Sequence, residues 1–278
     1  ELRGDPITCH WTDRDVMLYA LGIGMGDDPF DDKELAFVNE GWLTDRTPSV
    51  QVVPTFASVA TWHARPPAIE LNRVMIVDAE RDITFHKPLP VAATVSADSR
   101  WLGAWDKGDK GAILLRETEV RDTAGDLLWT LRGTTFARGD GNFGGPTSGQ
   151  PSLPGPPDRT PDLSVDIATR PGQALLYRLS GDRNPLHSDP EFAAKAGFKA
   201  PILHGMCTYG ITCRAVLSTF ADWDPAAIKR HACRFSSPVY PGETVRFEIW
   251  EEDGEARFRA SIPARDVVVL NNGAARFA

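Results

Sequence analysis

Residues 177–187 read YRLSGDRNPLH, and the fold assignment depends on this stretch and on the segments around it. A glycine and an Asn-Pro pair within it are residue types that favour turns, so the stretch is predicted to form a tight loop. Such a loop brings the carboxylate of Asp182, the amide of Asn184 and the imidazole of His187 close together. A carboxylate and an imidazole held side by side can transfer protons to and from a substrate.

A strongly apolar segment follows this loop. Residues 200–205 read APILHG, and residues 204–220 read HGMCTYGITCRAVLSTF. Apolar side chains are almost continuous in the second segment, which predicts a helix buried on most of its sides. Beyond it, residues 244–249 and 256–262 alternate polar and apolar side chains with a period of two, as β-strands do.

The C-terminal strands are predicted to be antiparallel. Residues 251–254, EEDG, form a natural hairpin turn between the two alternating segments. Residues 266–270 are predicted to form a further apolar strand. The tripeptide at 271–273, Asn-Asn-Gly, fits either another tight turn or a bulge in one long terminal strand, and the sequence leaves both open.

The first half of the chain repeats this order of elements. Residues 50–62 are apolar and predict a helix after Pro54, and strands are predicted from Ile83, from Val91, over 112–121 and over 126–136. A run of antiparallel strands around one buried helix is an α+β arrangement. Two such units in one chain are expected to pack sheet edge to sheet edge, which also covers their edge strands.

Short motifs indicate that the two halves are diverged copies. Residues 85–95, FHKPLPVAATV, match residues 235–245, FSSPVYPGETV, at four positions with an offset of 150. Upstream, Tyr19-Ala-Leu21 matches Tyr177-Arg-Leu179 with an offset of 158. Matches in the same order and at a nearly constant offset indicate a duplication.

A segment rich in Gly and Pro separates the copies. Residues 139–161 read GDGNFGGPTSGQPSLPGPPDRTP, a composition that can hold neither a helix nor a central strand. The predicted organisation is therefore a first unit over 1–138, a linker over 139–161 and a second unit over 162–278.

The composition limits the classes of partner. The chain has 278 residues, of which 42% are hydrophobic and 24% charged, so it can form a core and is not a disordered chain. No apolar run approaches the ~20 residues of a membrane helix. The net charge of −8 leaves no general basic surface for nucleic acid. Neither a membrane nor a nucleic acid is an expected partner.

The cysteines and the chain ends bear on the compartment. Cys9, Cys207, Cys213 and Cys233 form no Cys-x-x-Cys pair and are interpreted as reduced thiols. The N-terminus carries no signal segment, and the C-terminus is not a Ser-Lys-Leu address. The expected location is cytoplasmic, or peroxisomal if the chain is a domain cut from a multifunctional enzyme.

The sequence also resembles a known family. The pattern Tyr-x-Leu-Ser-Gly-Asp-x-Asn-Pro-Leu-His at 177–187 and Gly-Phe-x-x-Pro-Ile-Leu-His-Gly at 197–205 resembles the signature of the MaoC-like hydratases. It is most similar to the hydratase 2 type, the (R)-specific 2-enoyl-CoA hydratases, which include the hydratase part of the peroxisomal multifunctional enzyme type 2. The likeness covers most of the chain, because it extends to Tyr19-Ala-Leu-Gly22, Lys87-Pro-Leu-Pro90, Phe143-Gly-Gly145 and residues 234–242.

The resemblance implies a fold and a reaction. The fold is a double hot dog, in which each of two tandem units is an antiparallel sheet around a long helix, and this agrees with the duplication. The reaction is the addition of water to trans-2-enoyl-CoA to give (3R)-3-hydroxyacyl-CoA, which is reversible. The family carries it out with no metal and no organic cofactor. The expected partners are an acyl-CoA substrate and a second copy of the chain in a homodimer.

This chemistry accounts for the residue types. Hydration of an enoyl thioester needs a base for the attacking water, an acid for C2, and a donor to the thioester oxygen. Asp182 and His187 can hold one water between them and carry out both proton transfers. Asn184 would orient that water or hold the loop. Gly205 opens the predicted helix, so its free backbone N–H can point at the thioester oxygen, and its missing side chain lets the thioester approach.

The duplication predicts one active site per chain. At the offsets given above, Asp182, His187, His204 and Gly205 correspond to Gly24, Pro29, Pro54 and Thr55. The first half has therefore lost the catalytic residues. It is expected to line the pocket for a bulky acyl chain.

CoA is anionic, so an acidic protein needs a local group of cations to bind it. Lys87 is the first candidate, because the lysine of the family's Lys-Pro-Leu-Pro segment lies near bound ligand. Further candidates for contacts with the substrate are Arg183, Lys195, Lys199, His204, Arg234 and Phe235. The family often carries a His-Gly pair upstream of the lysine, where this chain reads MIVD over 75–78.

Other chemistries fit the sequence less well. A metal site of His187, Asp189 and His204 would have three ligands without other supporting signals. Cys207 is better explained as a small core residue than as a nucleophile. A hot dog thioesterase, a non-catalytic acyl-CoA-binding homologue, and a specialised enzyme for a sterol side chain, a branched acid or a polyketide thioester all remain open, because a fold does not fix a substrate.

Overall fold

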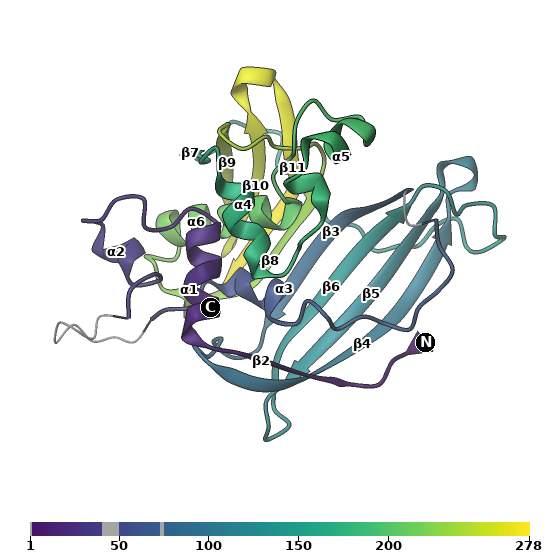
Figure 1. The fold of residues 1–278 in the computed structure, drawn as a ribbon, viewed down its shortest axis with the longest axis horizontal. Coiled ribbons are helices and arrows are strands. Elements are labelled where there is room, and N and C mark those ends of the chain that lie inside the picture. Colours follow the sequence, from purple (N-terminus) through teal and green to yellow (C-terminus); the bar gives the residue numbers. More distant parts are fainter. Residues whose placement is uncertain (1, 41–49, 73–74) are drawn as a thin grey trace.

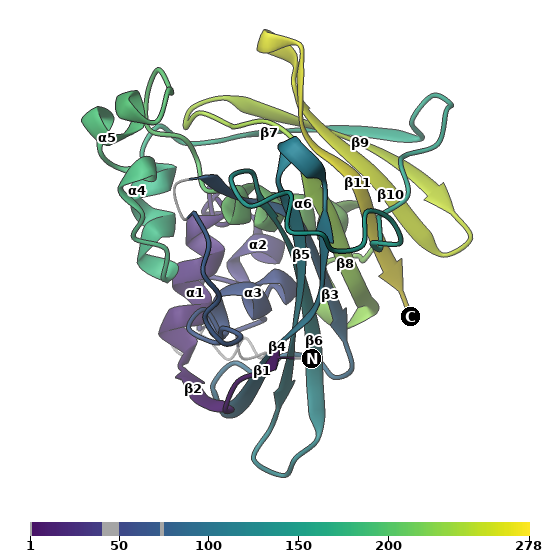
Figure 2. The same ribbon diagram turned by 90° about the vertical axis from the view of Figure 1, so that its right-hand side faces the viewer.

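The computed structural model describes residues 2–40, 50–72 and 75–278. Its strands form one continuous antiparallel sheet in the order β1-β4-β5-β6-β3-β8-β11-β10-β9-β7, with β2 paired to β4. Two views at right angles show the helices gathered on one side of this sheet (Figures 1 and 2). The predicted α+β arrangement is therefore present, and the two halves share a single sheet.

The strands of the first half are β1 (Leu2–Arg3), β2 (Ile7–Trp11), β3 (Ile76–Phe85), β4 (Ala93–Asp106), β5 (Ala112–Arg121) and β6 (Leu127–Ala137). Those of the second half are β7 (Leu163–Ala168), β8 (Ile228–Phe235), β9 (Thr244–Glu252), β10 (Glu255–Ile262) and β11 (Val267–Phe277). Each predicted strand is present, although β3 begins seven residues before Ile83.

The α-helices are α1 (Asp13–Gly22), α2 (Asp32–Leu35), α3 (Ala57–Ala60), α4 (Gln173–Tyr177), α5 (Pro190–Lys195) and α6 (Gly205–Thr219). Single 3₁₀ turns are η1 (Pro54–Phe56), η3 (Gly108–Lys110), η4 (Arg178–Ser180), η5 (Pro185–His187), η6 (Pro225–Ala227) and η7 (Pro263–Arg265). None of the described helices combines the length and the apolar character needed to cross a membrane.

The first unit has a much shorter helical segment than the second. The predicted helix after Pro54 consists of η1 and α3 and ends at Ala60, whereas α6 has 15 residues. Two prolines, Pro66 and Pro67, follow closely, and a residue before proline prefers extended backbone. The chain can therefore not extend this helix far past α3.

The C-terminal strands settle the choice that the sequence left open. Strand β11 is continuous, and its pairing with β8 shifts between Asn271 and Ala274, so the Asn-Asn-Gly tripeptide is a bulge and not a turn. Asn272 has a φ of 52°, as a bulge residue can. A Cβ on Gly273 would lie 2.2 Å from the ring of Phe258, so only glycine fits at that position.

The two halves join where β3 pairs with β8, a ladder that we call the seam. The pairs run from Glu80–Arg234 to Thr84–Arg230, and Asp82 faces Ala232 at their centre. Because Asp82 and Ala232 differ by the 150-residue offset of the duplication, the ladder is symmetric about this pair. Arg230 also donates two hydrogen bonds of 2.9 Å to the carboxylate of Asp82 across the seam. The edge-to-edge packing predicted for the duplicated units is confirmed.

Residues 139–161 contain no helix or strand, as their composition predicts. The segment is held against the second half, because Asn272 donates a 2.7 Å hydrogen bond to the carbonyl of Leu153. Whether the chain divides into independent units at these boundaries stays a prediction.

Helix α6 forms the centre of the core, with 11 of its residues buried. The duplicated tyrosines, Tyr19 of α1 and Tyr177 of α4, meet with ring centroids 5.9 Å apart. Gly210 lets α1 approach α6 closely, since a Cβ at Gly210 would lie 2.5 Å from Cγ2 of Ile23 and 2.7 Å from the hydroxyl of Tyr19.

Replacing Gly210 with alanine should therefore destabilise the protein. Alanine normally favours a helix over glycine by about 1 kcal/mol. Here the added methyl group overpacks a buried contact, which typically costs about 1–3 kcal/mol. We expect a net loss in the free energy of unfolding of Gly210→Ala, measured by chemical denaturation. The control is Ser218→Ala, on the exposed side of the same helix, whose stability should stay within about 0.5 kcal/mol of wild type. A Gly210→Ala protein more stable than wild type would contradict the close contact.

Candidate active site

The predicted loop and the start of α6 meet at a cavity of about 460 Å³. Both halves of the chain line it, because residues 76–78 of β3 lie opposite the loop of the second half. Of the residues singled out in the sequence, this cavity is lined by Asp182, Asn184, His187, Gly205 and Phe235. The seam makes this possible, since it places β3 next to β8.

Local hydrogen bonds shape the loop. The backbone N–H of Asn184 donates to Oδ1 of Asp182 at 3.0 Å, and Oδ1 of Asn184 accepts from the N–H of Leu186 at 3.0 Å. Asn184 thus caps the 3₁₀ turn η5 that ends at His187. Of the two roles predicted for Asn184, these contacts correspond to holding the loop.

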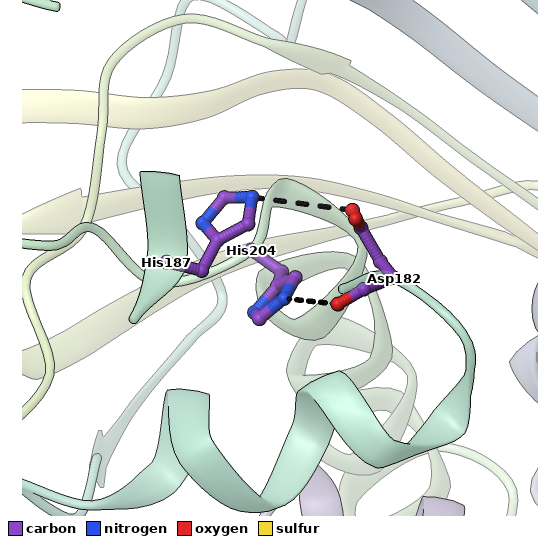
Figure 3. Close-up of side chains that lie close together, drawn as sticks. All are labelled: Asp182, His187 and His204. Atoms are coloured by element: carbon purple, nitrogen blue, oxygen red, sulfur yellow. Dashed lines mark hydrogen bonds and ion pairs between the residues drawn. The ribbon is translucent and has the colours of Figure 1, made fainter. Parts of the chain in front are cut away.

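His187 faces Asp182 across a short gap (Figure 3). Its Nδ1 lies 2.9 Å from the carbonyl of Ile202, which can only accept a hydrogen bond, so Nδ1 carries the proton. Burial lowers the pKa of His187, while the Ile202 carbonyl and the charge of Asp182 oppose that shift. In the neutral ring Nε2 is an acceptor, and it lies 3.9 Å from Oδ2 of Asp182.

The gap between these two atoms has the geometry of a water site. A separation of 3.9 Å is too long for a direct hydrogen bond, and a neutral imidazole nitrogen and a carboxylate oxygen are both acceptors. A single water has two hydrogens and can donate to both. The pair is therefore arranged to hold a water by its hydrogens and leave its oxygen lone pairs free.

His204 contacts both residues of this pair (Figure 3). Its Nε2 donates to the backbone carbonyl of Asp182 at 3.1 Å, and its ring stacks on His187 with centroids 3.7 Å apart. His204 is 1% exposed, and burial, together with the neighbouring His187, lowers its pKa to about 3. It does not line the cavity, and its contacts are those of a residue that positions Asp182 and His187.

Asp182, His187 and His204 could each offer one atom to a metal ion, all within 4.8 Å of one another. The two rings are stacked with an interplanar angle of 26°. A nitrogen lone pair lies in the plane of its ring, so stacked rings direct theirs side by side and not at one point. Asp189, the ligand considered from sequence, instead caps α5 by accepting hydrogen bonds of 2.9 and 3.1 Å from two backbone N–H groups. These side chains fit proton transfer better than metal binding.

Gly205 is the first residue of α6, so its N–H has no partner within the helix. It opens on the same cavity as Asp182 and His187. The ring of Phe235 covers the other side, 3.3 Å from where a Cβ of Gly205 would lie. A helix N-terminus that ends at a reactive cavity favours negative charge there.

The structure separates the predicted CoA-binding cations from this cavity. Lys87 pairs with Asp126 at 2.6 Å and with Asp122 at 3.4 Å, and it lines a different pocket. Arg183 is exposed and does not line the cavity. Lys199 lies 4.5 Å above the ring of Tyr240. Lys87 lies just beyond the end of β3, and Arg183 and Lys199 lie in loops, so their positions depend on the packing of these segments.

Two other predicted cations, Arg234 and Lys195, also lie away from the cavity. Arg234 faces Glu80 across the seam, and Lys195 is in the last turn of α5. The cavity is instead lined by Arg138 and Asp78, which sequence reasoning did not select. The one signal for Asp78 was the MIVD segment, which departs from the family pattern.

In the first half, the pocket that contains Lys87 is the counterpart of the cavity at Asp182 and His187. Residues 52, 85, 88 and 89 line it, and residues 202, 235, 238 and 239 line the cavity, each pair at the 150-residue offset. Its volume is about 40 Å³, against about 460 Å³. Pro54 and Thr55 occupy the positions of His204 and Gly205, so the first half keeps the surrounding residues of the site without the candidate catalytic groups.

Two family models match the chain, one in each half. The MaoC like domain matches residues 152–272, and the MFE-2 hydratase 2 N-terminal domain matches residues 9–139. The chain is 42% identical to the enoyl-CoA hydratase ChsH3 of Mycobacterium tuberculosis, covering 96% of this chain and 93% of that protein. It is 39% identical to the peroxisomal enoyl-CoA hydratase 2 of Arabidopsis thaliana, covering 94% and 88%.

The fold comparison gives the same result. The crystal structure of a MaoC-like dehydratase from Phytophthora capsici matches with a TM-score of 0.87 and 30% identity, covering 99% of this chain and 95% of that one. The double hot dog fold implied by the sequence is confirmed.

The buried His204 predicts a specific pH dependence of stability. Its folded pKa of about 3 lies below the ordinary value of about 6.5, so between these pH values only the unfolded state is protonated at this site, and stability falls as pH falls. In His204→Gln this contribution is absent, while the amide can still donate to Asp182. We expect the stability advantage of wild type over His204→Gln to shrink by about 1–2 kcal/mol between pH 7.5 and 5 in urea denaturation.

The control for this measurement is His63→Gln, which removes an exposed histidine. This replacement leaves the buried His204 in place, so the pH dependence should follow that of wild type. Parallel profiles for wild type and His204→Gln would show that His204 is not held neutral.

Proposed function

Since the chain belongs to the MaoC-like, hydratase 2 family and is an enoyl-CoA hydratase, we propose that it adds water to trans-2-enoyl-CoA to give (3R)-3-hydroxyacyl-CoA, with Asp182 and His187 as the catalytic pair. The observation that carries this proposal is the 3.9 Å gap between Nε2 of His187 and Oδ2 of Asp182, beside the N–H of Gly205 in one cavity. The (3R) configuration follows from the resemblance to the hydratase 2 type.

In the proposed reaction one water supplies both added groups. The water between the pair attacks C3 as His187 takes its proton, and the carboxylate of Asp182 stabilises the imidazolium that forms. The pair then returns a proton to C2, so the protein ends in its starting protonation state. The lowered pKa of His187 supports this role, because it keeps Nε2 unprotonated and ready to accept at neutral pH.

The N–H of Gly205 donates a hydrogen bond to the thioester oxygen of the substrate. Negative charge grows on this oxygen as water attacks C3, and a donor fixed at the start of a 15-residue helix meets that charge without reorganisation. Removing one such donor in other enzymes costs about 10²–10³ in rate. The pair and this N–H together supply every proton transfer and charge contact of the reaction, so we propose that no metal or organic cofactor takes part.

The remaining expectations belong to the same proposal. A homodimer is proposed on the family resemblance alone, and the cytoplasmic or peroxisomal location stays a prediction. Membership of the family does not fix the acyl group, so a specialised substrate such as a sterol side-chain or polyketide thioester remains an alternative.

The first test follows loss of the conjugated enoyl-thioester absorbance with a short and a long trans-2-enoyl-CoA. Wild type should hydrate at least one of them. Asp182→Asn removes the carboxylate and should lower kcat by about 10²–10⁴, the usual contribution of a positioned acid–base group. Asp189→Asn is the matched control, because asparagine also caps a helix and this carboxylate is not in the catalytic pair. Its rate should stay close to that of wild type.

Two parallel readouts separate the alternatives. A thiol reagent reports free CoA, whose release would identify a thioesterase and overturn the hydratase. A (3R)-specific 3-hydroxyacyl-CoA dehydrogenase should oxidise the product. Oxidation only by a (3S)-specific enzyme would overturn the configuration and leave hydration in place.

Proline at position 205 tests the backbone donor. Proline is accepted at the first position of a helix, and His204 already has the extended backbone, with ψ of 134°, that a residue before proline prefers. Gly205→Pro removes the N–H and should lower kcat by about 10²–10³. Gly205→Ala crowds Phe235 in the same way but keeps the donor, so it should retain far more activity. Equal losses in the two variants would assign the effect to crowding and not to the N–H.

A further inference from the structure

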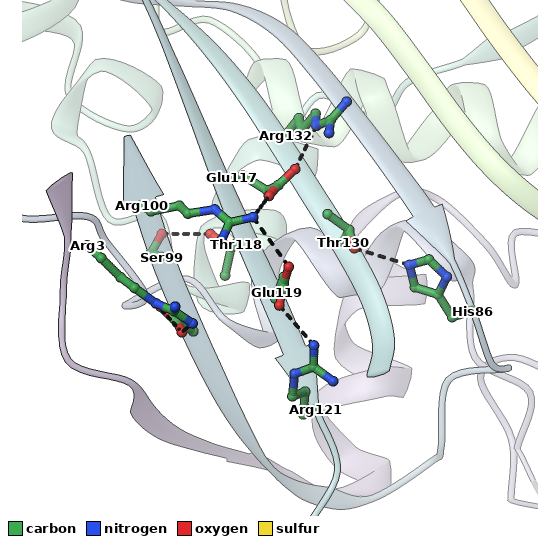
Figure 4. A network of polar contacts seen from close by, with 11 residues as sticks. Arg3, His86, Ser99, Arg100, Glu117, Thr118, Glu119, Arg121, Thr130 and Arg132 are labelled. Carbon is green, nitrogen blue, oxygen red and sulfur yellow. Dashed lines mark hydrogen bonds and ion pairs between the residues drawn. The ribbon is translucent and has the colours of Figure 1, made fainter. Parts of the chain in front are cut away.

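Charged side chains are paired on the outer face of the first-half sheet, whereas positive side chains meet on its inner face. On the outer face, Glu117 lies between Arg100 at 2.5 Å and Arg132 at 2.8 Å, so these charges neutralise one another (Figure 4). On the inner face, Arg81 of β3 and Arg116 of β5 both pair in register with Gly133 of β6. A Cβ on Gly133 would lie 2.5 Å from Nη1 of Arg81 and 2.9 Å from Nε of Arg116. The glycine makes room for two guanidinium groups to meet inside the protein.

These two arginines and Arg65 form a group that we call the arginine cluster, and its positive charge is not balanced. Arg81 is 3% exposed and pairs with Asp78 at 3.1 Å. Asp78 is also the one carboxylate among the described residues whose charge acts on Arg116. Within the part of the chain that the structure describes, Nε of Arg81 and Nε of Arg116 are buried without a hydrogen-bond partner.

Keeping this charge inside the fold is costly, because a buried ion without a partner loses its hydration. Burial and the two neighbouring arginines lower the pKa of Arg116 to about 9. Among the described residues, the carboxylates of Asp78 and Asp182 act on these three guanidinium groups, so the cluster keeps a net positive charge and donors for another anion. A guanidinium group binds a carboxylate with two parallel hydrogen bonds, so the chemistry of the cluster matches that ligand.

The arginine cluster lies next to the catalytic loop. The ring of Trp62 packs against Gly181, whose Cβ would lie 3.4 Å from it, and Gly181 directly precedes Asp182. Arg65 lies 4.8 Å above the same ring. Asp78, which pairs with Arg81, lines the catalytic cavity itself. One aromatic side chain thus separates the cluster from the loop that carries the catalytic pair.

We infer that the arginine cluster binds an anionic group at the far end of the acyl chain, so that the substrate is an enoyl-CoA whose acyl part ends in a carboxylate. This inference rests on the proposed function. The cavity among the three arginines and Trp62 is about 10 Å³, the space of roughly one water. Trp62 and the exposed Arg65 are the side chains that would move to admit a carboxylate. The phosphates of CoA are larger and hydrated, and they fit a site as buried as Arg81 less well.

The test compares pairs of trans-2-enoyl-CoA thioesters of equal length, one ending in a methyl group and one in a carboxylate. The measured quantity is the ratio of kcat/KM for the carboxylate-ended over the methyl-ended substrate, across a series of lengths. Wild type should favour the carboxylate at one length. Arg116→Met should lower that ratio by about ten- to a hundredfold, the effect of losing a charge-assisted hydrogen bond. Arg132→Met, on the outer face of the adjacent strand, is the matched control and should keep the wild-type ratio.

Near-ultraviolet circular dichroism would detect misfolding of Arg116→Met. A second variant keeps the inference testable in that case. Gly133→Ala keeps all three charges and displaces two of them, so it should also lower the ratio. A ratio below one at every length in wild type, or a ratio unchanged in both variants, would overturn the inference while hydration of the methyl-ended substrate upholds the proposed function. Hydration of neither substrate would overturn that function itself.

One further arm separates the two sources of anion. If Arg116→Met lowers kcat/KM equally for both substrates, and if this loss disappears with dephospho-CoA thioesters, then the cluster binds the 3′-phosphate of CoA. That outcome would overturn the inference. A loss confined to carboxylate-ended substrates, with or without the 3′-phosphate, supports it.

Discussion

The antiparallel pairing of β3 with β8 is the interaction on which the rest of the structure depends. It is centred on Asp82 and Ala232, which are equivalent positions of the two copies, so the ladder relates the halves by a local twofold axis. The pairing makes one sheet of two and covers two edges that would otherwise be open. It also places the wall of the first half, residues 76–78, against the catalytic loop of the second. Without it, the cavity would lack one side.

The loop that carries Asp182, Asn184 and His187 combines local hydrogen bonds with burial of its histidine. Asn184 closes the turn, and the two histidines are held in fixed orientations by backbone carbonyls of Ile202 and Asp182. Burial keeps both rings neutral by lowering their pKa values, which costs stability in acid and leaves Nε2 of His187 free to accept a proton. The stacked His204 contributes by fixing the ring in front of it. The buried histidines therefore make the protein less stable in acid. In return, they hold the two acceptors of the water site in fixed positions.

The two copies have diverged in complementary ways. The second half keeps a long buried helix that begins at the cavity, and the first half has reduced its helical segment to seven residues between Pro54 and Ala60. Its counterpart pocket is almost closed, yet its inner sheet face carries Arg81 and Arg116 beside Gly133. An apolar acyl chain gains nothing from such charges, so this face is better suited to a polar end of the substrate than to the bulky hydrocarbon expected from the duplication alone.

The sequence by itself determined the features that depend on neighbouring residues or on a repeat. The loop of Asp182, Asn184 and His187, the buried helix at Gly205, the strand order and the duplication were all predicted, because turn types, periodicity and motif spacing are local properties. Only the tertiary structure decided what depends on strand register. It placed Lys87 in a pocket apart from the cavity, made the tripeptide at 271–273 a bulge, and brought Arg81 and Arg116 together across Gly133. Register between distant strands is set by the packing of the whole core, and a one-residue slip would send each of these side chains to the other face of the sheet.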